Sequence, residues 1–237
     1  MSVLSPSVPV QPAPPPAMPS AADPDVPTVP IYRLSVEQYH AMIEAGILKS
    51  GDPVELLEGW LVQKMTKHPP HCTATRLTRR ALDVVVPEGW FVDSQEPLTT
   101  TESEPEPDIA VVRGDVRDYA TRHPGPQDMA LAVEVSDSSL PRDRGIKQRV
   151  YARAGIPTYW IVNLMDRVIE VCTDPTGPAD EPTYRQRQDF GPDAELPVVV
   201  DGREVGRLAV RDLLPRAASH RRDGRWTRRP CDGPCST

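Results

Sequence analysis

The stretch LAVEVSDSSLPRDRGIKQRVYARAGIPTYWIVN, residues 131–163, decides the fold of this 237-residue chain. An apolar run over residues 129–136 predicts a strand, and a second one over 158–163 predicts another. Between them, residues 142–154 have the composition and spacing of a helix that stops at a glycine. A strand, a helix and a further strand in this order indicate a fold that combines α and β structure.

The segments on either side predict further elements. Ser35 and Gln38 form a capping-box pattern at the start of a helix, and two prolines precede a second helix. The expected helices span 35–46, 71–86 and 142–154, and the expected strands are two within 54–65, then 90–95, 108–112, 129–136, 158–163, 167–173, 184–190 and 196–200, before a small terminal piece at 207–214. This order predicts a mixed α+β fold of the α/β class, with a central mixed sheet flanked by helices.

Composition divides the chain into three parts. Residues 1–30 hold ten of the 29 prolines and two charges, which predicts a disordered Pro-rich leader. Residues 216–237 carry six arginines and two aspartates and are expected to be a flexible Arg-rich tail. The domain between them, residues 31–215, has a charge of about −9, so we interpret the tail as the only plainly basic segment. A net charge of −7 excludes a surface that grips nucleic acid everywhere, although a local basic groove is compatible with it.

The cysteines and the apolar runs indicate in which compartment the protein is expected. The four cysteines are too few and too irregularly spaced for a disulfide framework, and no signal segment opens the chain. No apolar run is long enough to span a membrane, so we expect a cytoplasmic protein with no membrane partner. Cys231 and Cys235 could form half of a zinc site, but such a site usually needs four ligands at closer spacing. Trp226 and the arginines of the tail are candidates for sequence-independent contact with nucleic acid.

Two acids stand where an acid is unusual. Side chains alternate along a strand, so Glu134 shares one face with Ala132 while Leu131, Val133 and Val135 take the other. Asp108 opens the apolar run of residues 108–112. Either acid alone is more often a solvated strand end or a turn cap. Two carboxylates at one edge of a sheet, however, form an oxygen site suited to Mg²⁺, which needs only one or two protein carboxylates.

A lysine on the next helix could complete this group. Lys147 follows the Glu134 strand and can point back over the end of that strand. Taken alone, Asp143 and Lys147 are four residues apart, which is typical of an exposed ion pair on a helix face.

These residues carry a resemblance to a known family. The strings VELLEG (54–59), PEPDIAVV (105–112) and the long stretch above resemble the domain of the Uma family of restriction endonucleases, within the PD-(D/E)xK nuclease superfamily. The resemblance covers about residues 32–190. It implies a restriction-endonuclease-like core that acts on DNA.

Carried over by position, the resemblance gives roles to particular residues. It makes Asp108 and Glu134 the two acids of the superfamily motif. The motif lysine position holds Ser136, and the resemblance implies that Lys147 replaces that lysine from the helix. Glu55 in VELLEG matches a further acid of the family. His71 also matches a family position, although a polar residue near a helix start is the simpler interpretation.

Together these patterns predict a Mg²⁺-dependent endonuclease that hydrolyses DNA phosphodiester bonds. The catalytic candidates are Asp108, Glu134, Lys147 and Glu55, with Mg²⁺, or alternatively Mn²⁺, held by Asp108, Glu134 and the backbone carbonyl of Val135. A homodimer is expected, because two sites could then cut both strands. The alternative is a catalytically inactive module of the same fold that binds nucleic acid or a protein, and a non-nuclease enzyme that reuses the metal site is a third hypothesis.

Overall fold

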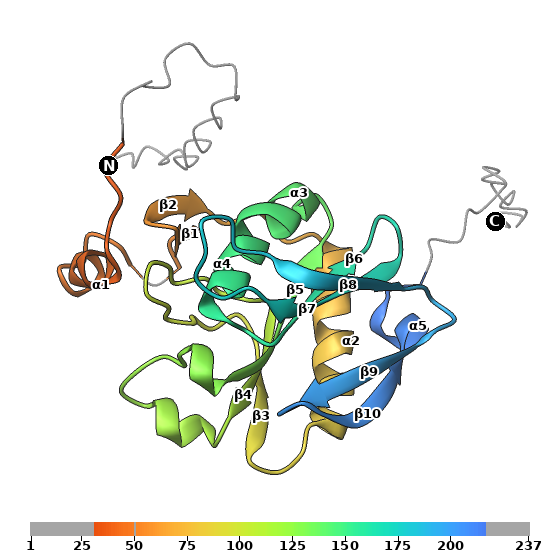
Figure 1. Cartoon of the computed structure of the whole chain (residues 1–237). Helices are drawn as coiled ribbons and strands as arrows, with labels where there is room; N and C mark the ends of the chain where they lie inside the picture. Colours follow the sequence, from red (N-terminus) through yellow and green to blue (C-terminus); the bar gives the residue numbers. More distant parts are fainter. Residues whose placement is uncertain (1–30, 50, 217–237) are drawn as a thin grey trace, which may run out of the picture. The chain divides into compact units, whose positions relative to one another are not determined.

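The computed structural model describes residues 31–49 and 51–216 of the chain. The chain divides into two units, Met1–Arg33 and Leu34–Thr237, and all elements below belong to the second (Figure 1). The predicted leader and nearly all of the predicted tail, including Trp226, Cys231 and Cys235, lie outside the described residues. Within the described part, no helix has the length and apolar character needed to cross a membrane.

A six-stranded sheet forms the centre, in the order β3-β4-β5-β6-β7-β8. Only β5 and β6 run parallel, and every other neighbouring pair is antiparallel, so the predicted mixed sheet is confirmed. The strands are β3 (Trp90–Asp93), β4 (Ile109–Arg113), β5 (Met129–Ser136), β6 (Thr158–Asn163), β7 (Val168–Pro175) and β8 (Tyr184–Phe190).

The connection between the two parallel strands contains the helix predicted over 142–154, but it has three parts. A short helical turn, α3 (Leu140–Arg142), leads into a π-helical turn, η3 (Asp143–Lys147), and then into α4 (Gln148–Ala154). Gly155 ends α4 in the left-handed conformation, at φ 74°, which glycine adopts at little cost. In the π-helical turn the Gln148 N–H donates to the Asp143 carbonyl five residues back. Such turns occur often at functional sites.

The two faces of the sheet bury different sets of side chains, as the alternation along β5 predicts. Leu131, Val133 and Val135 pack on one face, against α2 (Pro69–Val85) and the hairpin of β9 (Glu195–Val200) and β10 (Arg203–Ala209). Ala132 packs on the other face, against α4. Figure 1 shows α2 beside β9 and β10. The terminal piece predicted at 207–214 is the end of β10 followed by α5 (Val210–Leu213), which completes the first face.

Helix α1 (Val36–Glu44) and the hairpin of β1 (Val54–Leu57) and β2 (Trp60–Gln63), which contains Glu55, pack together outside the central sheet. Helix α1 has the predicted capping box, in which Ser35 and Gln38 exchange two hydrogen bonds. A bridge from Leu56 to Glu104 joins this hairpin to the chain that leads into β4. Two 3₁₀ turns, η1 (Val116–Tyr119) and η2 (Pro126–Asp128), lie between β4 and β5.

Candidate active site

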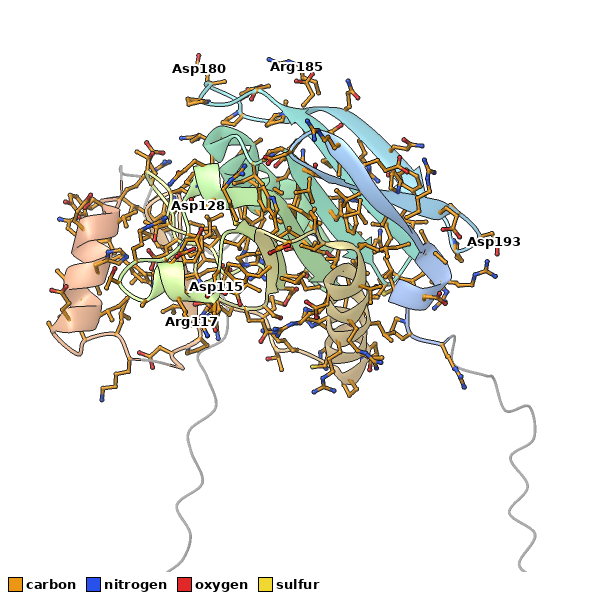
Figure 2. All side chains as sticks on the ribbon, turned by 90° about the horizontal axis from the view of Figure 1, so that it is seen from below. Asp115, Arg117, Asp128, Asp180, Arg185 and Asp193 are labelled. Carbon is orange, nitrogen blue, oxygen red and sulfur yellow. The ribbon has the colours of Figure 1, made fainter. Side chains whose placement is uncertain are left out.

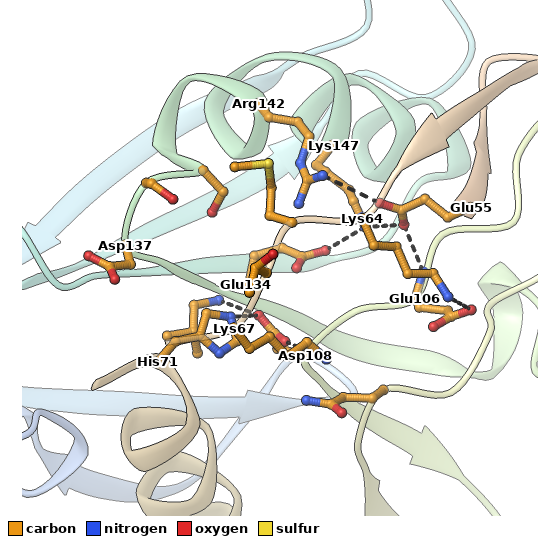
Figure 3. Close-up of a pocket in the computed structure, with 16 residues that line it drawn as sticks. Glu55, Lys64, Lys67, His71, Glu106, Asp108, Glu134, Asp137, Arg142 and Lys147 are labelled. Atoms are coloured by element: carbon orange, nitrogen blue, oxygen red, sulfur yellow. Dashed lines mark hydrogen bonds and ion pairs between the residues drawn. The ribbon is translucent and has the colours of Figure 1, made fainter. Parts of the chain in front are cut away.

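A polar pocket opens at the end of the sheet where β4 begins and β5 ends (Figure 3). Its volume is about 50 Å³, which is room for a few water molecules, since one needs about 10–15 Å³. All five residues predicted for the site line it: Glu55, Asp108, Glu134, Val135 and Lys147. The other charged side chains around it are Lys64, Lys67, His71, Glu106, Asp137 and Arg142.

Strand register brings the two acids of the predicted motif together. Ile109 of β4 is paired with Val133 of β5 in an antiparallel ladder, so the residue before Ile109 faces the residue after Val133. Those residues are Asp108 and Glu134. Both are buried, and Asp108 Oδ2 accepts a hydrogen bond of 2.9 Å from the Val135 N–H. The start of one strand and the end of its neighbour therefore place two carboxylates at one point.

Lys147 reaches the acids from the π-helical turn. Its Nζ lies 2.6 Å from Glu55 Oε2 and 3.0 Å from Glu134 Oε1, and its side chain is 1% exposed. Asp143 is also buried and instead accepts hydrogen bonds from Ser136 and Ser139. The interpretation of Asp143 and Lys147 as an exposed ion pair is therefore wrong. It failed because a helix pattern alone does not show which face lies against a sheet.

Ser136 occupies the position where the superfamily motif has a lysine. Its side chain is fully buried, and its hydroxyl donates to Asp143 Oδ2 at 2.5 Å. The ammonium group that contacts Glu134 comes from Lys147, which follows Ser136 by eleven positions in the chain. The geometry is thus the one expected if a lysine on the helix replaces the motif lysine.

Burial and neighbouring charges shift the protonation of this group. Burial raises the pKa of Glu134 to about 8, and the Lys147 ammonium opposes the rise. Burial by itself would lower the pKa of Lys147, but the carboxylates of Glu134 and Glu55 outweigh it and the net pKa is raised. The Tyr151 hydroxyl donates to Glu134 Oε1 at 2.6 Å, and burial raises the pKa of this tyrosine well above its usual value. Without a further cation, Glu134 is therefore harder to ionise than an ordinary carboxyl group.

Sequence reasoning underrated His71. This buried side chain points from the first turn of α2, and its Nε2 lies 3.0 Å from Asp108 Oδ2. Lys67 Nζ lies 3.9 Å from the other oxygen of Asp108, and Figure 3 shows both side chains beside that acid. His71 is a polar residue near a helix start, as the simpler interpretation holds, but α2 begins at the pocket and this position also places His71 beside Asp108.

The pocket also has a basic rim. Lys64 Nζ lies 2.5 Å from Glu106 Oε1, and Arg142 donates to the Gln63 carbonyl at 3.1 Å. Lys64 and Lys67 follow β2, and Arg142 ends α3. The sequence contains a signal for this rim, since no acid occurs between Glu58 and Asp83. The interpretation of the tail as the only basic segment overlooked it.

The donor set fits a magnesium-like ion. Among the described residues, no group of three or more His, Cys, Asp and Glu side chains is placed to hold a metal. Magnesium needs only one or two carboxylates and keeps several waters. Glu134 Oε2 accepts no hydrogen bond within the described part of the chain, and Asp108 Oδ1 faces only Lys67 at 3.9 Å. Two carboxylate oxygens at the pocket thus remain for a cation.

Comparisons with known proteins agree with this picture. The Uma2 family, described as "Putative restriction endonuclease", matches residues 36–210. A crystal structure of a protein from Anabaena variabilis, described as a "putative nuclease belonging to DUF820", has a similar fold, with a TM-score of 0.55 and 17% sequence identity. The similarity covers 76% of this chain and 97% of that one. A search of curated proteins found no match. Since the family match extends over most of the chain, this protein belongs to the Uma2 family of restriction-endonuclease-like proteins.

Proposed function

We propose that this protein is a metal-dependent endonuclease that hydrolyses DNA phosphodiester bonds. The observation that carries the proposal is the convergence of Asp108, Glu134 and the Lys147 ammonium on one pocket. These groups come from the residue just before β4, from β5 and from the π-helical turn. Membership of a restriction-endonuclease family supports the reaction class. Two acids that can hold a divalent ion, with an amine beside them, suit metal-assisted cleavage of a phosphodiester.

Asp108, Glu134 and the Val135 carbonyl would hold the metal, which we propose is Mg²⁺, with Mn²⁺ as an alternative for the same oxygen ligands. A divalent ion bound there supplies Lewis-acid polarisation of the phosphodiester and lowers the pKa of a bound water. The Val135 N–H fixes one oxygen of Asp108. Tyr151 fixes one oxygen of Glu134, so both acids keep their orientation before substrate arrives.

Lys147 would orient the attacking water or neutralise charge on the phosphate that is attacked. Glu55 holds the Lys147 ammonium at 2.6 Å and offsets its charge. Because Lys147 also lies 3.0 Å from Glu134 Oε1, Glu55 shares the ammonium with Glu134 and leaves Glu134 Oε2 and Asp108 Oδ1 for the metal. Glu55 is therefore proposed as a positioning residue for Lys147.

The domain that carries this activity is proposed to span residues 31–215 and to act in the cytoplasm. One pocket cuts one strand at a time, so a homodimer would bring two pockets to a duplex. The oligomeric state in solution, with and without DNA, tests this part separately.

Plasmid cleavage tests the proposed activity. The parent protein should nick or linearise supercoiled DNA in Mg²⁺ or Mn²⁺ and not in EDTA. Asp108→Asn and Glu134→Gln should each lower the rate at least about a hundredfold, because each removes a metal ligand. Asp193→Asn is the matched control, since Asp193 is exposed in the loop between β8 and β9 (Figure 2).

Calorimetry separates an inactive enzyme from an inactive fold. If the parent binds Mn²⁺ and Asp108→Asn does not, a metal site is present even where no cleavage is seen. Equal cleavage by the parent and by both site variants would overturn the proposal. A parent that binds DNA but neither binds metal nor cuts would instead favour the catalytically inactive module.

A further inference from the structure

A basic segment runs from the pocket along α2. Residues 59–82 contain no aspartate or glutamate, in a chain whose formal net charge is −7. The same residues carry five lysines or arginines: Lys64, Lys67, Arg76, Arg79 and Arg80. The segment comprises β2, the loop after it and most of α2. In an acidic protein, such a continuous basic segment is the electrostatic signature of a surface that meets polyanions.

The segment has one end in the pocket and the other on an open helix face. Lys64 and Lys67 line the pocket. On α2, the buried side chains His71, Ala74, Thr75, Thr78 and Leu82 face the protein. Arg76, Arg79 and Arg80 are exposed on the remaining face. The same helix therefore orients His71 toward Asp108 and presents three arginines to solvent.

These three arginines lack an acidic partner in the described part of the chain. Within the described residues, Arg76, Arg79 and Arg80 form no ion pair or side-chain hydrogen bond, in contrast to Arg117 and Arg185, which pair with aspartates. The first turn of α2 contains no acid either. The positive end of the helix dipole, worth about half a charge, is therefore not offset by an acid on α2 itself and adds to the positive charge of this segment. Each of these groups can take a phosphate without first breaking an ion pair.

The spacing suits a nucleic-acid strand. Arg76 and Arg80 are four residues apart, which is about 6 Å along the helix axis. Phosphates of one strand follow each other every 3.4 Å along a DNA duplex, so about two such steps separate the arginines. Lys67 lies in the loop just before α2, and its Nζ is 3.9 Å from Asp108 Oδ1 in the pocket.

We propose that Lys67, Arg76 and Arg80 form a track for the DNA backbone, along which α2 guides the substrate strand into the pocket. This inference rests on the proposed function, because it names the surface that holds the DNA while the pocket cuts it. Phosphate contacts carry no sequence information, so the track contributes affinity and register and leaves target choice to other contacts.

The test measures DNA binding without cleavage. A labelled duplex of about 30 base pairs is titrated in EDTA or in Ca²⁺ at several salt concentrations, with the parent and with Arg76→Gln/Arg80→Gln. Glutamine keeps the helix propensity nearly unchanged. Loss of two phosphate contacts should reduce the slope of log affinity against log salt concentration by about 1.8. Because the electrostatic contribution to binding fades near 1 M salt, this change in slope corresponds to binding that is about 10- to 60-fold weaker near 0.1 M salt.

The control variant is Arg117→Gln/Arg185→Gln, which changes the net charge equally. Arg117 lies on η1 and Arg185 on the edge strand β8, and Figure 2 shows both at the surface. This control should bind like the parent. Parent-like binding and salt slope in Arg76→Gln/Arg80→Gln, or equal weakening by the control, would overturn the track alone. A parent that binds no DNA even at low salt would overturn both the track and the proposed function.

Discussion

Replacing Lys147 by methionine tests whether the ammonium in the pocket holds the buried acids in place. Methionine keeps an unbranched apolar stem but removes the charge. Glu55 and Glu134 then lose the cation that lies 2.6 and 3.0 Å from them. Because all three side chains are buried, the few water molecules for which the pocket has room would replace the lost charge only in part. We expect a large loss of stability.

The size of the loss follows from distance and burial. At an effective dielectric constant of about 20, a pair of charges at 2.6 Å attracts by about 6 kcal/mol and a pair at 3.0 Å by about 5.5 kcal/mol. Much of this attraction offsets the cost of removing the ammonium from water. Breaking a buried pair by removing one partner costs about 3–5 kcal/mol. We expect this decrease in the free energy of unfolding near pH 8, and a smaller one well below pH 8, where Glu134 takes up a proton.

Urea unfolding in EDTA, followed by circular dichroism, measures the change. Lys64→Met is the matched control, since Lys64 Nζ lies 2.5 Å from Glu106 Oε1 but the two side chains are 29% and 24% exposed. Such a solvated pair contributes about 1 kcal/mol or less. The double variant Lys147→Met/Glu55→Gln should regain part of the lost stability. If Lys147→Met and Lys64→Met unfold with equal free energies, the reasoning from buried charge is refuted.

Three further predictions concern Glu134. Its pKa is raised from 4.5 to about 8, so its contribution to stability is complete below pH 4.5 and is lost as the pH rises to about 8, by at most about 5 kcal/mol. Glu134→Gln should flatten this part of the pH profile of urea unfolding. A parent profile that is already flat there would contradict the assignment. A metal that binds Glu134 must displace the proton on its carboxyl group. The Mn²⁺ affinity measured by calorimetry should therefore rise up to about tenfold per pH unit and level off above pH 8. An affinity that does not depend on pH would count against Glu134 as a ligand. Tyr151→Phe removes the hydroxyl 2.6 Å from Glu134 Oε1 and should lower the free energy of unfolding by about 1–3 kcal/mol, whereas an unchanged value would mean that this hydrogen bond contributes nothing net.

The sheet could be predicted from the sequence because its signal is local. The alternation around Glu134 identifies both faces of β5, and the apolar runs on either side give the neighbouring strands. The capping box at Ser35 fixes the start of α1 to within one residue. The π-helical turn could not be predicted, since it depends on how Asp143 and Lys147 pack against the sheet. The strand β10 was missed because residues 203–206 contain two charged residues and a glycine around a single valine, and only Leu208 of this strand is buried.

The site was harder to predict because its contacts span long sequence distances. The pairing of Glu55 with Lys147 joins residues 92 positions apart, and no periodicity links them. The resemblance supplied Glu55, Lys147 was already a candidate from its place after the Glu134 strand, and the geometry adds that the two bind each other. The place of His71 depends on where α2 begins relative to Asp108. By contrast, the acid-free stretch of residues 59–82 is visible in the sequence and needed only a count of charges along the chain.

The charged side chains of the pocket come from four separate segments of the chain, which are synthesised at different times. Glu55, Asp108 and Glu134 leave the ribosome before the turn that carries Lys147. Until that turn arrives, Lys67 and His71 can accompany Asp108, but Glu55 and Glu134 would be buried without the ammonium that contacts them both. We therefore expect this group of buried charges to form late in synthesis, once residue 147 has emerged.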